Sequence, residues 1–310
     1  MGSRFASIDV GTNSVLLLVA EQTADGTFQP VRERAEITRL GRGVDKSGKL
    51  APEAISDTVA VIAEFARDAR LLSAEGIVVS ATSAARDASN GRDFLDAVKR
   101  DAGVEVQIIS GEEEARLSFA SAWADFGGKG PLIVLDIGGG STEFIFGDAQ
   151  GRISFRHSFQ VGSVRLTERF VHSDPIPAQQ LEAVSKHLVE TFGALPAPPA
   201  GATLVAVAGT ATTVLGVSRA IEPYDSKKVH GVRMDFAEVL ATAKKLGDAP
   251  LSQRRGLPGL QPKRADVIVA GGLIMVEAMT RLGAKEVVIS DRGLRWGLLV
   301  DRFSSKGARA

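Results

Sequence analysis

Apolar and polar positions along this chain form the same succession twice. The apolar run Phe5–Val10 is followed by a short polar stretch rich in turn residues and then by a second apolar run, Val15–Val19; the same order recurs at Leu132–Asp136 and Thr142–Phe146. Short apolar runs bounded by turn residues are typical of buried strands. The pattern predicts two copies of a strand-loop-strand unit, each continued by a third strand, at Phe28–Arg34 and Ile153–Val161.

Helical spacing begins after the first three strands. Pro52 can open a helix, and the apolar residues after it recur every three or four positions. Alternating strands and helices then complete each half, and Gly127–Pro131 marks a break between the halves. This order predicts a duplicated α/β fold with mixed β-sheets. We expect further strands at 77–80, 104–109, 203–208 and 286–290, and helices at 52–69, 93–99, 111–125, 164–170, 178–192, 212–220, 236–246, 264–282 and 294–303.

The polar stretch between the paired strands carries glycine in both copies. It reads Asp9-Val10-Gly11-Thr12-Asn13-Ser14 in the first and Asp136-Ile137-Gly138-Gly139-Gly140-Ser141 in the second, named here loop 1 and loop 2. A loop that leads into a strand does not place an anion at a helix N-terminus. It can still direct backbone N–H groups at a phosphate, since glycine allows the necessary dihedral angles and a close approach. Two such loops facing each other across a cleft would hold a phosphate chain from both sides.

Composition narrows the class of protein. The 310 residues include 37 basic and 37 acidic side chains, so no overall field favours nucleic acid or a membrane surface. The absence of cysteine excludes a disulfide scaffold and a thiolate metal site. No segment is long and apolar enough to span a bilayer. We therefore expect a soluble cytoplasmic protein that binds neither nucleic acid nor membrane.

Three adjacent acids, Glu112, Glu113 and Glu114, follow Ser110. Ser110 and Glu113 have the spacing of a capping box, and Glu112 suits the positive end of a helix. Neither effect requires Glu114. Neighbouring carboxylates repel and raise each other's proton affinity, which could suit one of them to accept a proton.

Asp136 and Glu143 lie on either side of loop 2, where a strand-loop-strand unit can bring both carboxylates together. Carboxylate oxygens suit Mg²⁺ bound with substrate phosphates. The alternative is that Asp136 only stabilises the loop and Glu143 is a solvated strand residue. A third segment, Gly209-Thr210, lies between a predicted strand and helix and can offer N–H groups to an anion. Arg86 follows a strand end, where it either pairs with Asp87 or stabilises a phosphoryl group.

Taken together, several motifs give a specific resemblance. Loop 1, Ser110-Gly111-Glu112-Glu113-Glu114-Ala115-Arg116, Asp136 through Glu143 and Gly209-Thr210 occur in the order typical of the exopolyphosphatase/guanosine pentaphosphate phosphohydrolase (Ppx/GppA) family. The chain resembles its short two-domain form, within the actin, hexokinase and heat-shock-70 superfamily. The resemblance implies two ribonuclease-H-like domains of the actin-like ATPase type around an interdomain cleft. The expected domains are residues 1–126 with a C-terminal helix at about 297–310, and residues 127–296.

The resemblance also implies roles for residues. Glu114 would activate the attacking water with Arg86 beside it, and Asp136, Glu143 and Asp9 would hold Mg²⁺ or another divalent cation. The expected reaction is release of phosphate from the end of inorganic polyphosphate. Guanosine pentaphosphate hydrolysis, a kinase or ATPase activity, and a non-catalytic polyphosphate or alarmone sensor are the alternatives; a homodimer is a further expectation. The implied phosphate-binding residues are Gly11, Thr12, Asn13, Ser14, Gly138, Gly139, Gly140, Ser141, Thr142, Gly209 and Thr210.

One position departs from the family pattern. The family commonly ends in Gly-Leu-Arg-Glu-Gly, whereas this chain reads Gly293-Leu294-Arg295-Trp296-Gly297. The exchange leaves Glu114 in place but could alter an ion pair, the domain interface or a dimer surface.

Overall fold

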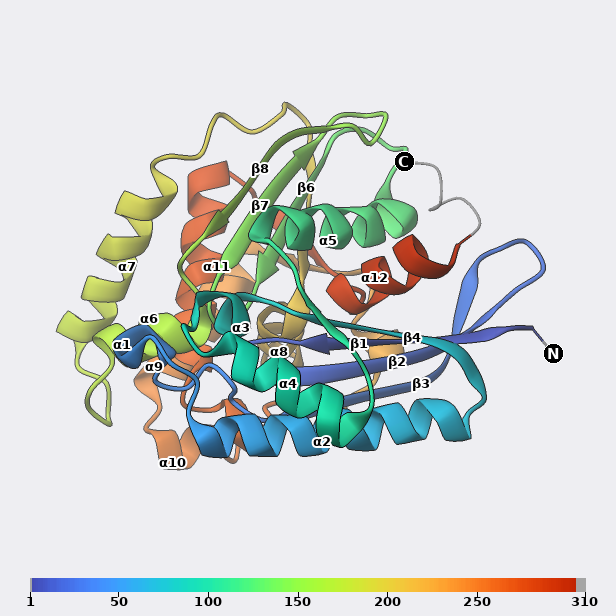
Figure 1. Cartoon of the computed structure of the whole chain (residues 1–310). Coiled ribbons are helices and arrows are strands. Elements are labelled where there is room, and N and C mark those ends of the chain that lie inside the picture. Colours follow the sequence, from blue (N-terminus) through green and yellow to red (C-terminus); the bar gives the residue numbers. More distant parts are fainter. Residues whose placement is uncertain (1, 305–310) are drawn as a thin grey trace. The chain divides into compact units, whose positions relative to one another are not determined.

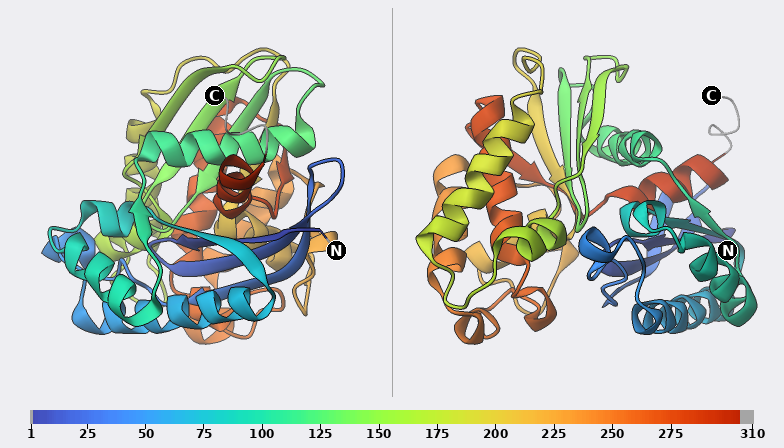
Figure 2. Two further views of the ribbon diagram at one scale, coloured as in Figure 1. Left: turned by 45° about the vertical axis from the view of Figure 1, so that its right-hand side comes forward. Right: turned by 60° about the vertical axis from the view of Figure 1, so that its left-hand side comes forward.

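The computed structural model describes residues 2–304, and the chain divides into two compact units. The first comprises the residues up to Ser121 together with those from Leu294 onward, and the second runs from Ala122 to Gly293. The boundaries expected from the sequence fall at 126/127 and 296/297, and residues 305–310 of the expected C-terminal helix lie outside the described residues. Figures 1 and 2 show the elements of both units.

The first unit contains a five-stranded mixed sheet in the order β3-β2-β1-β4-β5. The first three strands pair antiparallel, whereas β1 with β4 and β4 with β5 pair parallel. The antiparallel part is built from consecutive segments, while the parallel part requires helical crossovers. The strands are β1 (Arg4–Val10), β2 (Ser14–Gln22), β3 (Phe28–Ile37), β4 (Ala74–Ala81) and β5 (Val106–Ile108).

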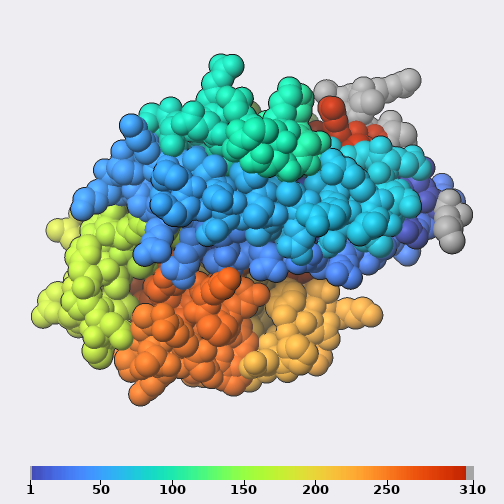
Figure 3. Space-filling view, turned by 60° about the horizontal axis from the view of Figure 1, so that its bottom comes forward, coloured from blue at the N-terminus to red at the C-terminus, as the bar shows by residue number. Residues whose placement is uncertain are grey.

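Strand β2 is covered on both faces of the sheet, which explains its continuous apolar run. Leu17 and Val19 pack into the core beneath α2 (Pro52–Leu71) and α4 (Gly91–Ala102), and these helices form an outer face of the unit (Figure 3). Leu18 points to the opposite side, because successive strand residues alternate. There it packs with Trp296 of α12 (Leu294–Phe303). Trp296 is therefore a core residue of the first unit, and its side chain is only 5% exposed.

The second unit repeats this topology in a six-stranded sheet, ordered β10-β11-β9-β6-β7-β8. Its antiparallel part is β6, β7 and β8; β6 with β9 and β9 with β11 pair parallel. An additional edge strand, β10, pairs antiparallel with β11. The strands are β6 (Leu132–Ile137), β7 (Thr142–Gly147), β8 (Ile153–Phe159), β9 (Thr203–Val207), β10 (Val232–Asp235) and β11 (Glu286–Ile289).

Helix α11 (Ile268–Leu282) lies at the centre of the second unit's core. Its residues are buried nearly all round, as expected of a helix whose sequence is apolar on every face. The surrounding helices are α6 (Ser163–Phe170), α7 (Ala178–Phe192), α8 (Ala208–Ser218) and α9 (Phe236–Asp248). The predicted fold class, a duplicated α/β fold with a mixed sheet in each half, is confirmed.

The sequence-based prediction missed the shortest elements. Helices of four or five residues complete little more than one helical turn, so their apolar positions do not recur and no periodicity can be recognised. Two helix starts were also predicted wrongly. Helix α8 begins at Ala208 rather than near 212. Helix α11 begins at Ile268 rather than at 264, because a 3₁₀ turn, Pro262–Arg264, precedes it. The missed elements are α1 (Val44–Ser47), α3 (Ser83–Asp87), α10 (Leu251–Arg254), β10 and the 3₁₀ turn Ser226–Lys228.

Helix α5 (Gly111–Phe126) begins in the first unit and ends in the second, and the chain returns to the first unit at Leu294. Within the first unit, α5 and α12 approach closely at Gly297, where an added Cβ would lie 2.2 Å from the backbone oxygen of Leu117. None of the helices within residues 2–304 combines the length and apolar character needed to cross a membrane.

We expect Gly297→Ala to destabilise the protein by about 1–3 kcal/mol, because the new methyl group collides with backbone that cannot rotate away. Gly293→Ala is the matched control, since its Cβ would meet no heavy atom closer than 3.7 Å. Urea unfolding of both variants measures the difference. Equal midpoints would show that α5 and α12 separate at little cost.

Candidate active site

Loop 1 is a tight turn between β1 and β2. The N–H of Gly11 donates to the carbonyl of Ser14 at 2.9 Å, which closes the turn. Thr12 and Asn13 are buried, and the Thr12 hydroxyl lies 2.7 Å from that of Ser83 in α3. Asp9, the first residue of loop 1, belongs to β1 and is half-buried. The Thr12 side chain is one of the predicted phosphate-binding groups, and its hydroxyl has a hydrogen-bond partner within the protein.

Glu114 is the buried member of the three adjacent acids. Its side chain is on the first turn of α5 and the residue is 8% exposed, whereas Glu112 is exposed and Glu113 is half-buried. The Ser110 hydroxyl accepts from the Glu113 N–H, as a capping box requires, and the Glu113 carboxylate accepts two hydrogen bonds from Arg116. Arg116 also pairs with Asp301, and these two acids raise the pKa of its guanidinium. The cap and the surface pair therefore occupy Glu113 and leave Glu114 for another role.

Arg86 approaches the buried carboxylate of Glu114. Its Nη1 lies 3.4 Å from Glu114 Oε2 and donates to the Ile109 carbonyl at 3.1 Å. Its Nε lies 3.6 Å from Asp87, so the predicted pairing with Asp87 and the approach to Glu114 occur together. Nη2 of Arg86 is buried without a hydrogen-bond partner among the described residues. Because guanidinium groups favour bidentate partners such as phosphate, this nitrogen is suited to an anionic ligand.

Loop 2 has the same turn as loop 1 and is flanked by two buried acids. The Gly138 N–H donates to the Ser141 carbonyl at 3.0 Å. Asp136 on β6 and Glu143 on β7 are direct cross-strand partners, so their side chains project from the same face of the sheet. Asp136 is 5% exposed and Glu143 is fully buried, with its Oε1 accepting from Ser158 at 2.7 Å. The alternative in which Glu143 is a solvated strand residue is wrong.

These two carboxylates fit a divalent cation that keeps part of its water shell. Mg²⁺ is usually held by one or two carboxylates together with water and substrate phosphates. No group of three or more His, Cys, Asp and Glu side chains within residues 2–304 forms a fuller ligand set. The Ser158 hydroxyl would orient Glu143 as an outer partner of the metal site.

The neighbouring hydroxyls of loop 2 lie in the interior. Ser141 and Thr142 are buried, and the Thr142 hydroxyl donates to the Val161 carbonyl at 2.6 Å. Gly139 and Gly140 complete the loop and bring their backbone close to the segment that follows β8.

The prediction that Gly209 and Thr210 lie between a strand and a helix is wrong. They belong to the first turn of α8, whose first residue, Ala208, has a φ of 69°. Strand β9 brings this turn beside loop 2, since Val207 is the register partner of Asp136. The backbone N–H groups of a first helical turn have no intrahelical acceptor, so the turn still suits an anion.

Sequence reasoning missed the cation at this helix end. Arg264 is adjacent to Lys263 in the sequence, and its Nη1 would lie 2.4 Å from a Cβ at Gly209. Burial lowers the pKa of the Arg264 guanidinium. Only glycine at position 209 allows this approach, which a sequence pattern does not reveal. Arg254, in contrast, is buried and donates to the carbonyls of Leu246, Ala249 and Ala265, so it is structural.

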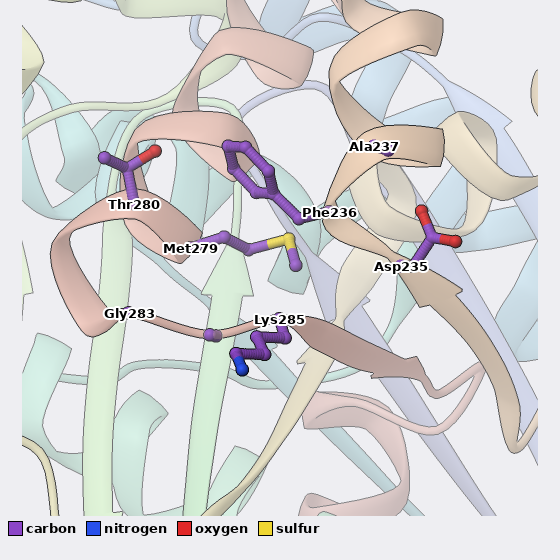
Figure 4. A pocket seen from close by; sticks show the side chains of 8 residues that line it. Asp235, Phe236, Ala237, Met279, Thr280, Gly283 and Lys285 are labelled. Carbon is purple, nitrogen blue, oxygen red and sulfur yellow. The ribbon is translucent and has the colours of Figure 1, made fainter.

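A shallow pocket of about 460 Å³ lies elsewhere in the second unit. Figure 4 shows the Phe236 and Met279 side chains next to each other in its wall. Asp235 at its rim already caps α9 through the N–H of Glu238. None of the predicted site residues lines it; its lining residues are Asp235, Phe236, Ala237, Met279, Thr280, Gly283, Ala284 and Lys285.

Comparison with known proteins gives a consistent result. Residues 18–306 match the model of the Ppx/GppA phosphatase family. Exopolyphosphatase 2 of Mycobacterium tuberculosis is 36% identical over 96% of this chain and 97% of its own length. Exopolyphosphatase 1 of Mycobacterium bovis is 31% identical, over 98% of this chain and 89% of its own.

Solved structures show the same fold. The Ppx/GppA family member of Aquifex aeolicus superposes with a TM-score of 0.80 at 31% identity, covering 96% of each chain. The crystal structure of an exopolyphosphatase-like protein superposes with a TM-score of 0.90 at 32% identity, covering 99% of each chain.

Arg86→Met should lower the free energy of unfolding by about 1–3 kcal/mol, because the buried Glu114 carboxylate loses a cation and the Ile109 carbonyl loses a donor. Urea unfolding at neutral pH measures the loss. In a Glu114→Gln background the cost should be smaller, since no charge is then left uncompensated. Equal costs in both backgrounds would show that Arg86 and Glu114 are not coupled.

Proposed function

Because this chain belongs to the Ppx/GppA phosphatase family, whose members hydrolyse phosphoanhydride bonds, we propose that it is an exopolyphosphatase. It would release phosphate from the end of inorganic polyphosphate. The observation that carries the proposal is Glu114, a buried carboxylate with a guanidinium 3.4 Å away, on the helix turn where the family motif places its base. The names of the mycobacterial relatives support polyphosphate as the substrate.

Glu114 orients a water molecule and accepts its proton as the oxygen attacks the terminal phosphorus. The bond to the bridging oxygen breaks in line, and the shortened chain leaves. Arg86 stabilises negative charge on the transferring group through the nitrogen that has no partner among the described residues. Loop 1, loop 2 and the first turn of α8 bind phosphate oxygens through backbone N–H groups.

Asp136 and Glu143 would hold Mg²⁺. When bound, the ion neutralises charge on phosphate oxygens, which lowers the cost of bringing a polyanion and an attacking water together. The protein supplies a dry, fixed pair of oxygen ligands, because both carboxylates are buried and Glu143 is oriented by Ser158.

Glu114→Gln should reduce phosphate release from polyphosphate by about a hundredfold or more, because the amide cannot accept the proton of water. Binding of the substrate should be nearly unchanged, since the amide has the same shape. The assay compares wild type and variant on short polyphosphate, long polyphosphate, guanosine pentaphosphate and ATP with Mg²⁺. Comparable losses of turnover and binding would remove Glu114 from the role of base.

The same substrates decide between the proposed activity and its alternatives. Faster release from guanosine pentaphosphate than from polyphosphate would make the chain a nucleotide phosphohydrolase that uses the same groups. Tight polyphosphate binding without release from any substrate would favour a sensor. Release of phosphate from ATP alone would contradict the exopolyphosphatase assignment.

Ser158→Ala should raise the divalent-cation concentration needed for half-maximal phosphate release by about tenfold to a hundredfold, as expected for the loss of an outer partner of a metal ligand. Ser154→Ala is the matched control on the same strand, because its hydroxyl donates to the Phe146 carbonyl at 3.2 Å rather than to a carboxylate. Mn²⁺ binding followed by electron paramagnetic resonance provides a readout independent of turnover. Unchanged binding in Ser158→Ala and in Asp136→Asn would place the metal elsewhere.

A further inference from the structure

We propose that Arg39 and Arg165 are phosphate-binding residues, one attached to each glycine loop. The inference rests on the proposed function, because it names residues that recognise the same phosphate chain. Neither loop contains a cation of its own: the six residues of each include one aspartate and no lysine or arginine. Positive charge from a neighbouring segment favours polyanion binding at a loop that carries a carboxylate, in addition to the charge of a bound divalent cation.

In the first unit, the segment after β3 is bound to loop 1 through the backbone. The N–H groups of Thr38 and Arg39 both donate to the Asn13 carbonyl, at 3.2 and 3.0 Å, and that of Gly41 donates to the Thr12 carbonyl at 2.8 Å. Gly41 has no space for a side chain, because a Cβ would lie 2.3 Å from Thr12 Cγ2. The backbone of Arg39 is therefore fixed next to loop 1.

The conformation of Arg39 is unfavourable for a residue with a side chain. Among the described residues, four that are not glycine have a positive φ, and that of Arg39 is 57°. Ser73 and Ala220 each lie one residue beyond the C-cap of a helix, α2 or α8, where a left-handed residue commonly terminates a helix. Arg39 follows a strand, so helix termination does not explain it. Strain of this kind concentrates at functional sites, and here it is tolerated at an arginine where glycine would fit.

In the second unit, the segment after β8 is bound to loop 2 in a similar way. The N–H groups of Val164 and Arg165 both donate to the Gly139 carbonyl, at 2.9 and 3.1 Å. Gly162 has no space for a side chain, since a Cβ would lie 2.5 Å from the carbonyl carbon of Gly139. The Arg165 side chain also reaches the loop, where its Nε donates to the Gly140 carbonyl at 2.7 Å.

Each half of the chain thus places an arginine beside its glycine loop. In each, the arginine's own backbone N–H donates to a carbonyl of the glycine loop, in a segment that follows the third strand and contains a glycine packed against that loop. The Arg165 guanidinium uses Nε for the loop and Nη2 for Gln160 at 3.0 Å, which fixes its plane beside Gly140. A guanidinium fixed beside backbone that binds phosphate adds a localised positive charge to the site.

Four variants test the proposal: Arg39→Gly, Arg39→Lys, Arg165→Ala and Arg165→Lys. Arg39→Gly keeps the left-handed backbone and removes the charge, so the thermal midpoint should stay the same or rise. The KM for tripolyphosphate and its Kd by calorimetry should both rise about tenfold to a hundredfold in Arg39→Gly and Arg165→Ala, with a smaller change in kcat. Each lysine variant should recover part of the loss, because the charge returns without the planar group.

The matched controls are Arg42→Ala and Arg169→Ala, which remove exposed arginines from the same two segments. Their KM and Kd should change less than about twofold, as expected for exposed charges. Equal losses in the controls, or an unchanged Kd in Arg39→Gly, would overturn the proposal. A loss in Arg165→Ala that lysine does not recover, and that falls on kcat alone, would show that Arg165 only shapes loop 2.

Calorimetry separates this proposal from the proposed function. If the wild-type chain binds tripolyphosphate but releases no phosphate, the exopolyphosphatase assignment fails, and the Kd values of the variants still decide the role of the two arginines. If the wild-type chain releases phosphate and the variants match it in both KM and Kd, the assignment stands and the role of the arginines is disproved.

Discussion

The structure depends on backbone hydrogen bonds that join each glycine loop to the chain segment after the third strand of its unit. A turn between antiparallel strands leaves carbonyl groups that need donors when they are buried. Thr38, Arg39 and Gly41 supply those donors to loop 1, and Ser163, Val164 and Arg165 supply them to loop 2. The loops are thereby fixed by residues distant in sequence, and small residues at the closest approaches are a geometric requirement.

The extent of burial distinguishes acidic residues that look alike in the sequence. Glu113 forms a surface pair with Arg116, whereas Glu114, one position later, is buried and lies beside Arg86. Asp136 and Glu143 are buried as cross-strand partners. A carboxylate removed from water needs a cation, a hydrogen bond or a metal. The same groups also bind phosphate, so these acids are suited to a site for a phosphate ester or anhydride. Burial thus distinguishes Glu114, Asp136 and Glu143 from the acids at the surface.

The two halves of the chain share one topology, so their glycine loops occupy the same place in each sheet. Each sheet combines three consecutive antiparallel strands with parallel strands reached through helices, and each places its glycine loop between the first two strands. The halves have nevertheless diverged: loop 1 uses Thr12 and Asn13 where loop 2 uses glycines, and the second sheet has gained the edge strand β10. The covering helices are also different, since the second core is built around the buried helix α11.

The sequence by itself determined the succession of strands along the chain apart from β10, the duplication, the long helices and the identity of both loops, because strand alternation, helical periodicity and turn residues are local signals. It also singled out Glu114, since capping and the helix dipole account for the two acids before it. Only the tertiary structure decided that Gly209 begins α8, that Arg264 packs on it, that Arg254 is structural, and that Trp296 is a core residue. Those outcomes depend on packing between segments far apart in the chain, and neither periodicity nor spacing carries that information.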